Sequence, residues 1–146
     1  MNTDRALVLD CLRDGRTPVA IASNPLAQDL HGEILALDAT LGTAVLAFTP
    51  PARFVQGAGV LQGGIIATVL DFAMAFAAHA RLAGEERRFS TATLTLTLLR
   101  PAPPGRYLAQ GRIVRAGGRL LFAEAELSAE SGGESIARAS ALMPLV

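Results

Sequence analysis

The chain has 146 residues, 51% hydrophobic and 18% charged, with a formal net charge of zero at pH 7. This length suits one domain with a sizeable core, and the charged share lies below the roughly 25% usual in soluble domains, so we expect an oligomer that hides apolar surface between copies. No block of basic residues is present to contact phosphates along a strand, which argues against nucleic-acid binding.

The first 30 residues are expected to form an N-terminal helix and loop extension, ahead of a main domain at 31–146. Residues 2–14 could form the helix and lack the continuous apolar region of a secretory signal. Residues 15–31 are predicted to be loop. Cys11 is the single cysteine, which excludes an internal disulfide and favours a reducing, cytoplasmic location.

Two short strands are predicted next, at 33–38 and 44–48. Gly42 lies between them and supplies a turn, so the pair is expected to form a hairpin. Pro50 and Pro51 end the second strand, because adjacent prolines cannot continue a hydrogen-bonded ladder.

A glycine-rich stretch, 56–64, leads into a long predicted helix over 65–82. The helix has no internal glycine or proline and is apolar nearly all round, so we expect it to be buried. Its apolar run, 65–80, contains Asp71 and is shorter than the roughly 20 residues that cross a bilayer. No membrane association is expected.

The rest of the chain is predicted to be β structure. Residues 91–98 alternate hydroxyl and apolar side chains with the period of a strand. Strands at 107–116 and 120–128 are joined through a Gly-Gly hairpin signal, and a last strand is expected at 135–143. This order predicts an α+β fold in which an antiparallel sheet is wrapped around one long buried helix.

Asp71 is the most informative residue, because no basic residue lies within two helical turns of it. Burying an unpaired carboxylate costs several kcal/mol, so a buried aspartate is usually paired or functional. Asp71 is therefore a candidate for chemistry. The alternatives are that it reaches solvent on one stripe of the helix or pairs with a distant arginine.

Gly63 and Gly64 precede the helix and would leave its first N–H groups open to a ligand. Such groups stabilise a carbonyl oxygen that becomes an oxyanion. Gly64 and Asp71 share one helix face but lie about 10 Å apart along the axis. A site that uses both is easier to build from the antiparallel helices of two subunits.

Residues 61–74 resemble the His-Gly-Gly-(six residues)-Asp-x-Ala motif of the PaaI-like branch of hot-dog-fold thioesterases. Residues 99–105 and 114–120 resemble a strand end and a hairpin of the same family, and the resemblance extends from about Leu35 to the C-terminus. It implies the hot-dog fold and hydrolysis of an acyl-CoA thioester to a free acid and coenzyme A.

The resemblance also implies roles for individual residues. Asp71 would act as nucleophile or as general base on water, and the N–H of Gly64 would polarise the thioester carbonyl. Gln56 would lie near the water or the carbonyl, and Thr91 would hold the water or the carboxylate. Gln62 replaces the usual histidine; its amide donates a hydrogen bond but carries neither charge nor a transferable proton.

Substrate contacts are predicted from the chemistry of the side chains. The guanidinium groups of Arg100, Arg115 and Arg119 would meet the phosphates of coenzyme A. The acyl group would lie between subunits of a dimer, or of a dimer of dimers, against Leu61, Phe72, Met74 and Phe76. Gly63 is also expected to contact the substrate. No cofactor is expected. No metal is expected either, because His31 and His79 are isolated.

Two other functions remain open. A non-catalytic acyl-CoA binding module or sensor is favoured by Gln62 and opposed by the retained Asp71. A hot-dog dehydratase would need an Asp/His pair near the helix entry, and no histidine lies there. The length of the acyl group and whether it is aromatic also stay open. So does the question whether the acyl group is carried by coenzyme A or by a carrier protein.

Overall fold

Seven strands form one antiparallel sheet in the computed structural model, which describes residues 2–146. The order across the sheet is β1-β2-β3-β5-β6-β7-β4, so β4 lies at an edge although it follows β3 in the chain. The strands are β1 (Val19–Ala20), β2 (Glu33–Asp38), β3 (Thr43–Phe48), β4 (Thr93–Leu98), β5 (Tyr107–Ala116), β6 (Leu120–Ala129) and β7 (Ala137–Pro144).

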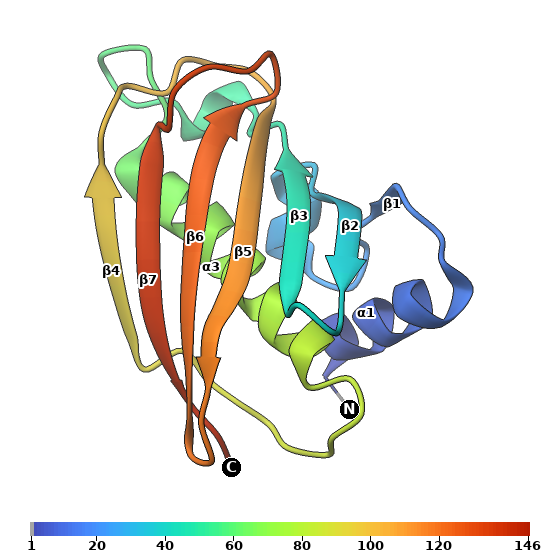
Figure 1. Ribbon diagram of the computed structural model, residues 1–146. Helices are drawn as coiled ribbons and strands as arrows, with labels where there is room; N and C mark the ends of the chain where they lie inside the picture. The colour runs from blue at the N-terminus through green and yellow to red at the C-terminus, as the bar shows by residue number, and fades with distance from the viewer. Residues whose placement is uncertain (1) are drawn as a thin grey trace.

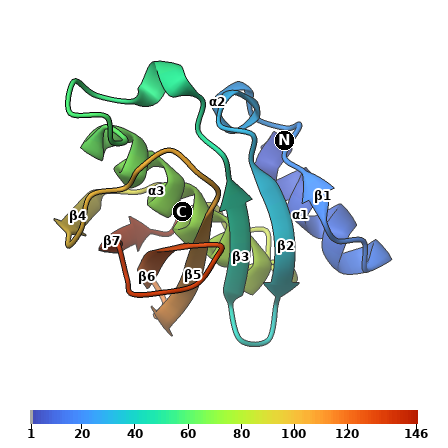
Figure 2. The ribbon, with the colours of Figure 1, turned by 90° about the horizontal axis from the view of Figure 1, so that it is seen from above.

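One long helix, α3 (Gly63–Arg81), crosses behind the sheet (Figure 1). Seen from above, the strands follow a curve around this helix (Figure 2), which is the arrangement expected from the sequence. The other helices are α1 (Thr3–Asp14), α2 (Pro25–Asp29) and the short 3-10 helix η1 (Ala52–Phe54). The strands and the long helix predicted from the sequence are all present, with ends shifted by one or two residues.

Gly111 in β5 allows α3 to lie very close to the sheet. A Cβ atom at this position would come within 2.2 Å of the carbonyl oxygen of Ala73, so only glycine fits without displacing the helix. Around this crossing the core is apolar, with Leu46, Phe76 and Leu127 almost fully buried. The position of α3, and with it that of Asp71, depends on this contact.

The expectation that α3 is buried all round needs correction. Its buried side chains face the sheet and α1, but Gly64 is exposed, and Thr68, Asp71 and Ala75 are only partly covered. These four residues recur at helical spacing and form one stripe, which we call the open stripe of α3. The sheet covers one side of the helix and leaves this stripe partly open to solvent in the single chain.

The expectation that the apolar helix is too short to cross a membrane also needs correction, because α3 is longer than the apolar run on which that expectation was based. α3 has 19 residues and a mean hydropathy of 1.5, enough by length and composition to span a bilayer. In the folded chain, 56% of that apolar window is buried against other elements. A core helix meets the same criteria.

The N-terminal residues pack against the main sheet and helix. Val8 and Cys11 belong to the same apolar core as α3, and Arg5 donates a hydrogen bond to the carbonyl of Leu82 at 3.2 Å, just beyond the end of α3. The predicted loop over 15–31 is wrong, because β1 and α2 lie within it. Asn24 caps the N-terminus of α2, and its side chain accepts from the N–H of Leu26.

Candidate active site

Asp71 and Thr91 meet beside α3. The Thr91 hydroxyl donates to a carboxylate oxygen of Asp71 at 3.0 Å. Thr91 lies just before β4, where the N–H of Ala92 donates to the carbonyl of Leu142 and fixes the segment against β7. In residues 2–146 Asp71 forms no ion pair, so pairing with a distant arginine is excluded within the chain. Its carboxylate is half-buried and open along the stripe.

The start of α3 offers two backbone donors. Gln62 caps the helix with extended backbone, and its carbonyl accepts from the N–H of Ile65 at 2.9 Å and of Ile66 at 3.3 Å. Gly63 and Gly64 occupy the first two helical positions, whose N–H groups find no acceptor within a helix. The space where a Gly64 side chain would lie is open. The sequence singled out the Gly64 N–H; the structure adds that of Gly63.

The two glutamines lie near the helix start but differ in their contacts. The side-chain oxygen of Gln56 accepts from the N–H of Ala58, so it closes its own loop. Gln62 is exposed, makes no side-chain capping bond, and donates its backbone N–H to the carbonyl of Phe54 at 3.0 Å. The Gln62 amide is thus free to approach a ligand at the helix start.

Asp71 and Gly64 do not meet within one chain. They lie about 10 Å apart along the axis of the same helix, as expected from its rise per residue. The carbonyl of Gly64 accepts from the hydroxyl of Thr68 at 2.8 Å, on the open stripe between them. Within one chain, the carboxylate and the backbone donors therefore do not share a single site.

The predicted acyl-contact residues differ in accessibility. Phe72 is half-buried and stacks on Phe48, with ring centroids 5.9 Å apart. Leu61 is 4% exposed and Met74 is fully buried in the core. In this chain, Leu61 and Met74 contribute to packing, whereas Phe72 borders a surface.

The three predicted phosphate-binding arginines lie at opposite ends of the sheet. Arg100 follows β4, forms an ion pair with Glu134 and donates to the carbonyl of Ser135 at 2.8 Å. Arg115 and Arg119 lie at the hairpin between β5 and β6 and are exposed. The structure thus separates Arg100 from the other two.

His79, two turns beyond Asp71, is buried in the core. Its ring lies 4.7 Å from that of Phe89 and 6.4 Å from that of Phe76, and its Nδ1 atom has no partner in residues 2–146. Burial lowers its pKa to about 4; nearby Asp4 opposes this shift and Arg5 adds to it. His79 is therefore neutral near pH 7 and lies away from Asp71's open stripe.

No metal-binding group of three or more histidine, cysteine or acidic residues occurs within residues 2–146. His31 is exposed, and its Nδ1 atom lies 3.1 Å from the carbonyl oxygen of Thr49. It has no other candidate ligand at metal-binding spacing.

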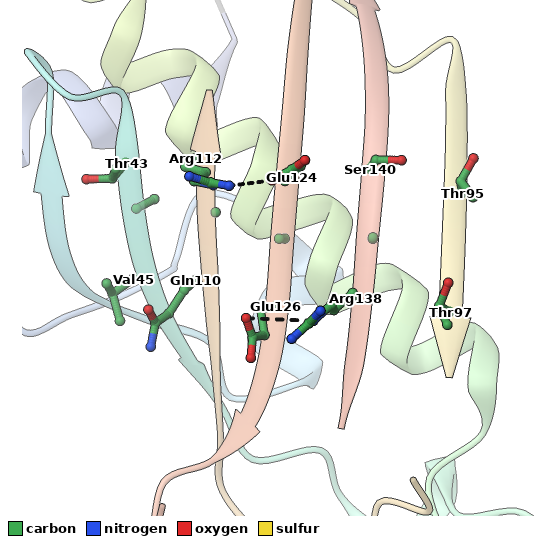
Figure 3. Close-up of a pocket in the computed structure, with 14 residues that line it drawn as sticks. Thr43, Val45, Thr95, Thr97, Gln110, Arg112, Glu124, Glu126, Arg138 and Ser140 are labelled. Atoms are coloured by element: carbon green, nitrogen blue, oxygen red, sulfur yellow. Dashed lines mark hydrogen bonds and ion pairs between the residues drawn. The ribbon is translucent and has the colours of Figure 1, made fainter. Parts of the chain in front are cut away.

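A hollow of about 690 Å³ lies on the opposite face of the sheet from α3 (Figure 3). Its charged side chains pair across neighbouring strands, Arg112 with Glu124 at 2.7 Å and Arg138 with Glu126 at 4.0 Å. The remaining polar groups are hydroxyls and an amide of the types found on solvated strands. It lies apart from Asp71 and lacks an acid–base group left unpaired, so we assign the chemistry to the α3 side.

The sequence and the structure both match known thioesterases. Residues 58–136, more than half of the chain, match the thioesterase superfamily. A phenylacetic acid degradation-related protein of Ralstonia eutropha is 29% identical, with a TM-score of 0.79 over 94% of this chain and 98% of its own. A thioesterase family protein of Silicibacter pomeroyi is 27% identical, with a TM-score of 0.79 over 97% and 98% of the two chains.

The PaaI protein of the E. coli phenylacetic acid degradation operon shares the fold at 18% identity, with a TM-score of 0.77 over 100% of this chain and 96% of its own. No curated protein sequence matches significantly. The chain belongs to the thioesterase superfamily and has the hot-dog fold of its PaaI-like branch, which supports thioester hydrolysis as its general chemistry.

Proposed function

We propose that the protein hydrolyses an acyl-CoA thioester in a site shared by two subunits, with Asp71 as its catalytic carboxylate. The observation that carries this proposal is the Thr91–Asp71 hydrogen bond beside a helix whose first N–H groups are free. A carboxylate held by one hydroxyl keeps its other oxygen for water or substrate. The helix start supplies the donors that a carbonyl oxygen needs as it becomes an oxyanion.

The edge of β4 favours association with a second copy. Leu94, Leu98 and Leu99 are between 38% and 51% exposed. The N–H of Leu99 donates to the carbonyl of Ile136, next to β7. Because the N–H groups of successive residues in a strand point to opposite sides, those of Leu94, Leu96 and Leu98 point away from β7. An open edge with apolar side chains is a natural pairing surface.

A two-fold axis beside β4 would pair this strand with its copy in antiparallel orientation. The start of β4 in one subunit would then lie near the end of β4 in the other. Thr91 and Asp71 lie at the start, whereas Leu98 at the end lies 3.1 Å from the position of a Gly63 Cβ. This pairing would carry Asp71 toward the helix start of the partner subunit.

The proposed reaction breaks the bond between the carbonyl carbon and sulfur. Water attacks the carbon while Asp71 takes its proton, or Asp71 attacks directly and the resulting anhydride is hydrolysed by water. The N–H groups of Gly63 and Gly64 of the partner subunit stabilise the oxyanion. Collapse of the tetrahedral species releases coenzyme A as its thiolate. Gln62 adds a hydrogen bond but no proton transfer.

The remaining features of the proposal follow from composition and fold. The protein is proposed to work without a cofactor, in the cytoplasm, as a homodimer or dimer of dimers. The acyl group would approach between subunits along the half-buried side chain of Phe72, whose other side stacks on the ring of Phe48.

Thiol release from short, medium, long and aryl acyl-CoA thioesters tests the proposal. Asp71→Asn should lower turnover at least about 100-fold, since an amide neither accepts the proton nor attacks the carbonyl. Asp29→Asn, an exposed carboxylate paired with Arg53 at 3.2 Å, is the matched control and should keep the wild-type rate. Equal rates in both variants, with both proteins folded, would exclude Asp71.

The second candidate is an acyl-CoA binding module, which Gln62 in place of the family's histidine favours. Calorimetric binding of acyl-CoA with no thiol release from any member of the panel would select it.

A further inference from the structure

Thr91 lies in a segment that a short ladder attaches to the sheet. After α3 the chain passes to the start of β4 (Figure 1), and on the way its backbone bonds to the C-terminal residues. Arg88 and Val146 exchange two hydrogen bonds of 2.9 Å, and the N–H of Ser90 donates to the carbonyl of Pro144 at 3.4 Å. The bond that directly precedes Thr91 is therefore the longest in this ladder.

Such a ladder fixes where Thr91 lies along β7, but its bonds lie in the plane of the sheet and do not set how closely a side chain approaches α3. Phe89 precedes Thr91 by two residues, so the two side chains of this extended segment point to the same face. Both contact α3. The Thr91 hydroxyl lies 3.0 Å from Asp71, and the ring of Phe89 lies 4.7 Å from that of His79.

His79 is held between two phenyl rings. Its side chain is 7% exposed, and its ring is inclined by 74° to that of Phe76 and by 53° to that of Phe89. Its Nδ1 atom has no partner in residues 2–146, so a leucine would fill this place without burying an unpaired polar atom. What the imidazole contributes is a flat ring, whose edge and face suit contact with neighbouring aromatic rings.

These rings belong to a continuous row along α3. Ring centroids lie 6.3 Å apart between Phe72 and Phe76, and 6.4 Å apart between Phe76 and His79. We call the four rings in contact the ring row: Phe72, Phe76, His79 and Phe89. One end of the row adjoins Asp71 in the sequence, and the other end precedes Thr91 by two residues. Because a close-packed interior transmits displacements, the row links the positions of both partners of the Thr91–Asp71 hydrogen bond.

We propose that His79 and Phe89 are positioning residues for the reaction. Their contact sets how deeply the segment before β4 packs onto α3, and so holds the Thr91 hydroxyl against the carboxylate of Asp71. This role rests on the proposed function and adds to it two residues that touch neither the substrate nor the reacting atoms. It makes turnover depend on the buried end of α3, about 12 Å along the helix from Asp71.

The kinetics of thiol release by His79→Leu and Phe89→Leu test this role. Each change removes one ring and should lower kcat about fivefold with KM unchanged, a loss within the range of coupled neighbours. His79→Phe keeps a flat ring and should keep most of the rate. Ile34→Ala is the control and should keep the wild-type kcat, because it removes a buried side chain of β2, far across the sheet from β4.

A Thr91→Val background separates positioning of the hydroxyl from a general loosening of the core. Because the hydroxyl is then absent, adding His79→Leu or Phe89→Leu should change kcat by less than about twofold. If the losses multiply instead, the rings act independently of Thr91 and the inference is overturned.

The side-chain rotamer of Thr91 gives a readout that needs no turnover. Three-bond couplings measured by NMR should report a single χ1 rotamer in the wild type and in Ile34→Ala, and averaged couplings in the two ring variants. A wild-type protein that releases no thiol would reject the proposed enzyme, and the rotamer would still decide the positioning role. A single rotamer retained in both His79→Leu and Phe89→Leu would overturn that role.

Discussion

Asp71 depends on a partner that lies 20 residues away in sequence. The helix places the carboxylate on the open stripe, and the segment entering β4 brings the Thr91 hydroxyl to 3.0 Å. One hydrogen bond to a charged acceptor orients a carboxylate without neutralising it. We therefore propose that Thr91 is a positioning residue for Asp71.

Thr91→Val removes the hydroxyl and keeps the shape of the side chain. We expect kcat for thiol release to fall about tenfold, the size of a lost hydrogen bond to a charged group. Thr91→Ser keeps the hydroxyl and should restore most of the rate, which a purely structural role would not require. A wild-type rate in Thr91→Val would show that Asp71 is oriented by something else.

Single residues were predictable to different degrees. Asp71 stands out in the sequence because its helical neighbours are apolar, but its contact with Thr91 follows only from the resemblance or from the structure. The loop-closing bond from Ala58 to Gln56 has no sequence signal that separates it from a substrate contact. Pairing of arginines with carboxylates across strands depends on register, which the sequence leaves open.

At the scale of elements, α3 carries both halves of the proposed site, one at its start and one at its middle. Gly111 sets how deeply the helix lies against β5, because any side chain there would meet the Ala73 carbonyl. The C-terminal end of α3 is held by the packing of His79 against Phe89. Phe89 lies in the segment that leads from α3 to Thr91.

His79 should make stability depend on pH. Its folded pKa of about 4 lies below its ordinary value of 6.5, so between these values the unfolded chain binds a proton that the folded chain does not. The free energy of unfolding should therefore fall as pH drops from 6.5 toward 4, by up to about 3 kcal/mol.

Thermal unfolding between pH 4 and pH 8 measures this loss. His79→Leu removes the titrating group and sacrifices no bond at Nδ1, so it should show a shallower decline over the same window. A decline as steep as that of the wild type would assign the pH dependence to other groups.

Most elements could be predicted because their periodicity is strong. The alternation of threonine and leucine over β4 and the long apolar run of α3 each fit one kind of element. α2 was missed because five residues are too few to show a period, although Asn24 followed by Pro25 is a helix-start signal.

At the scale of the whole molecule, three features of residues 2–146 remain open to solvent. The open stripe of α3, the free edge of β4 and the exposed leucines beside it lie on one side of the protein. The high apolar content predicted shared surface, but composition does not locate it. The topology, which moves β4 to the sheet edge, supports the location that we propose for it.

The central claim is that the site combines Asp71 of one subunit with the start of α3 of the other. Gly64→Pro removes one of the free N–H groups at a position in the first turn where proline is tolerated, and Gly64→Ala, which has open space for its side chain, is the control. Asp71→Asn and Gly64→Pro should each be inactive alone, while Gly64→Ala should stay active.

The most direct measurement is thiol release by a hybrid dimer of the Asp71→Asn and Gly64→Pro chains, co-expressed with two different tags and purified through both. A shared site predicts one intact and one doubly altered site per hybrid, and so about half of the wild-type activity. A hybrid as inactive as its two parents would contradict the account, because each chain would then have to build its site alone.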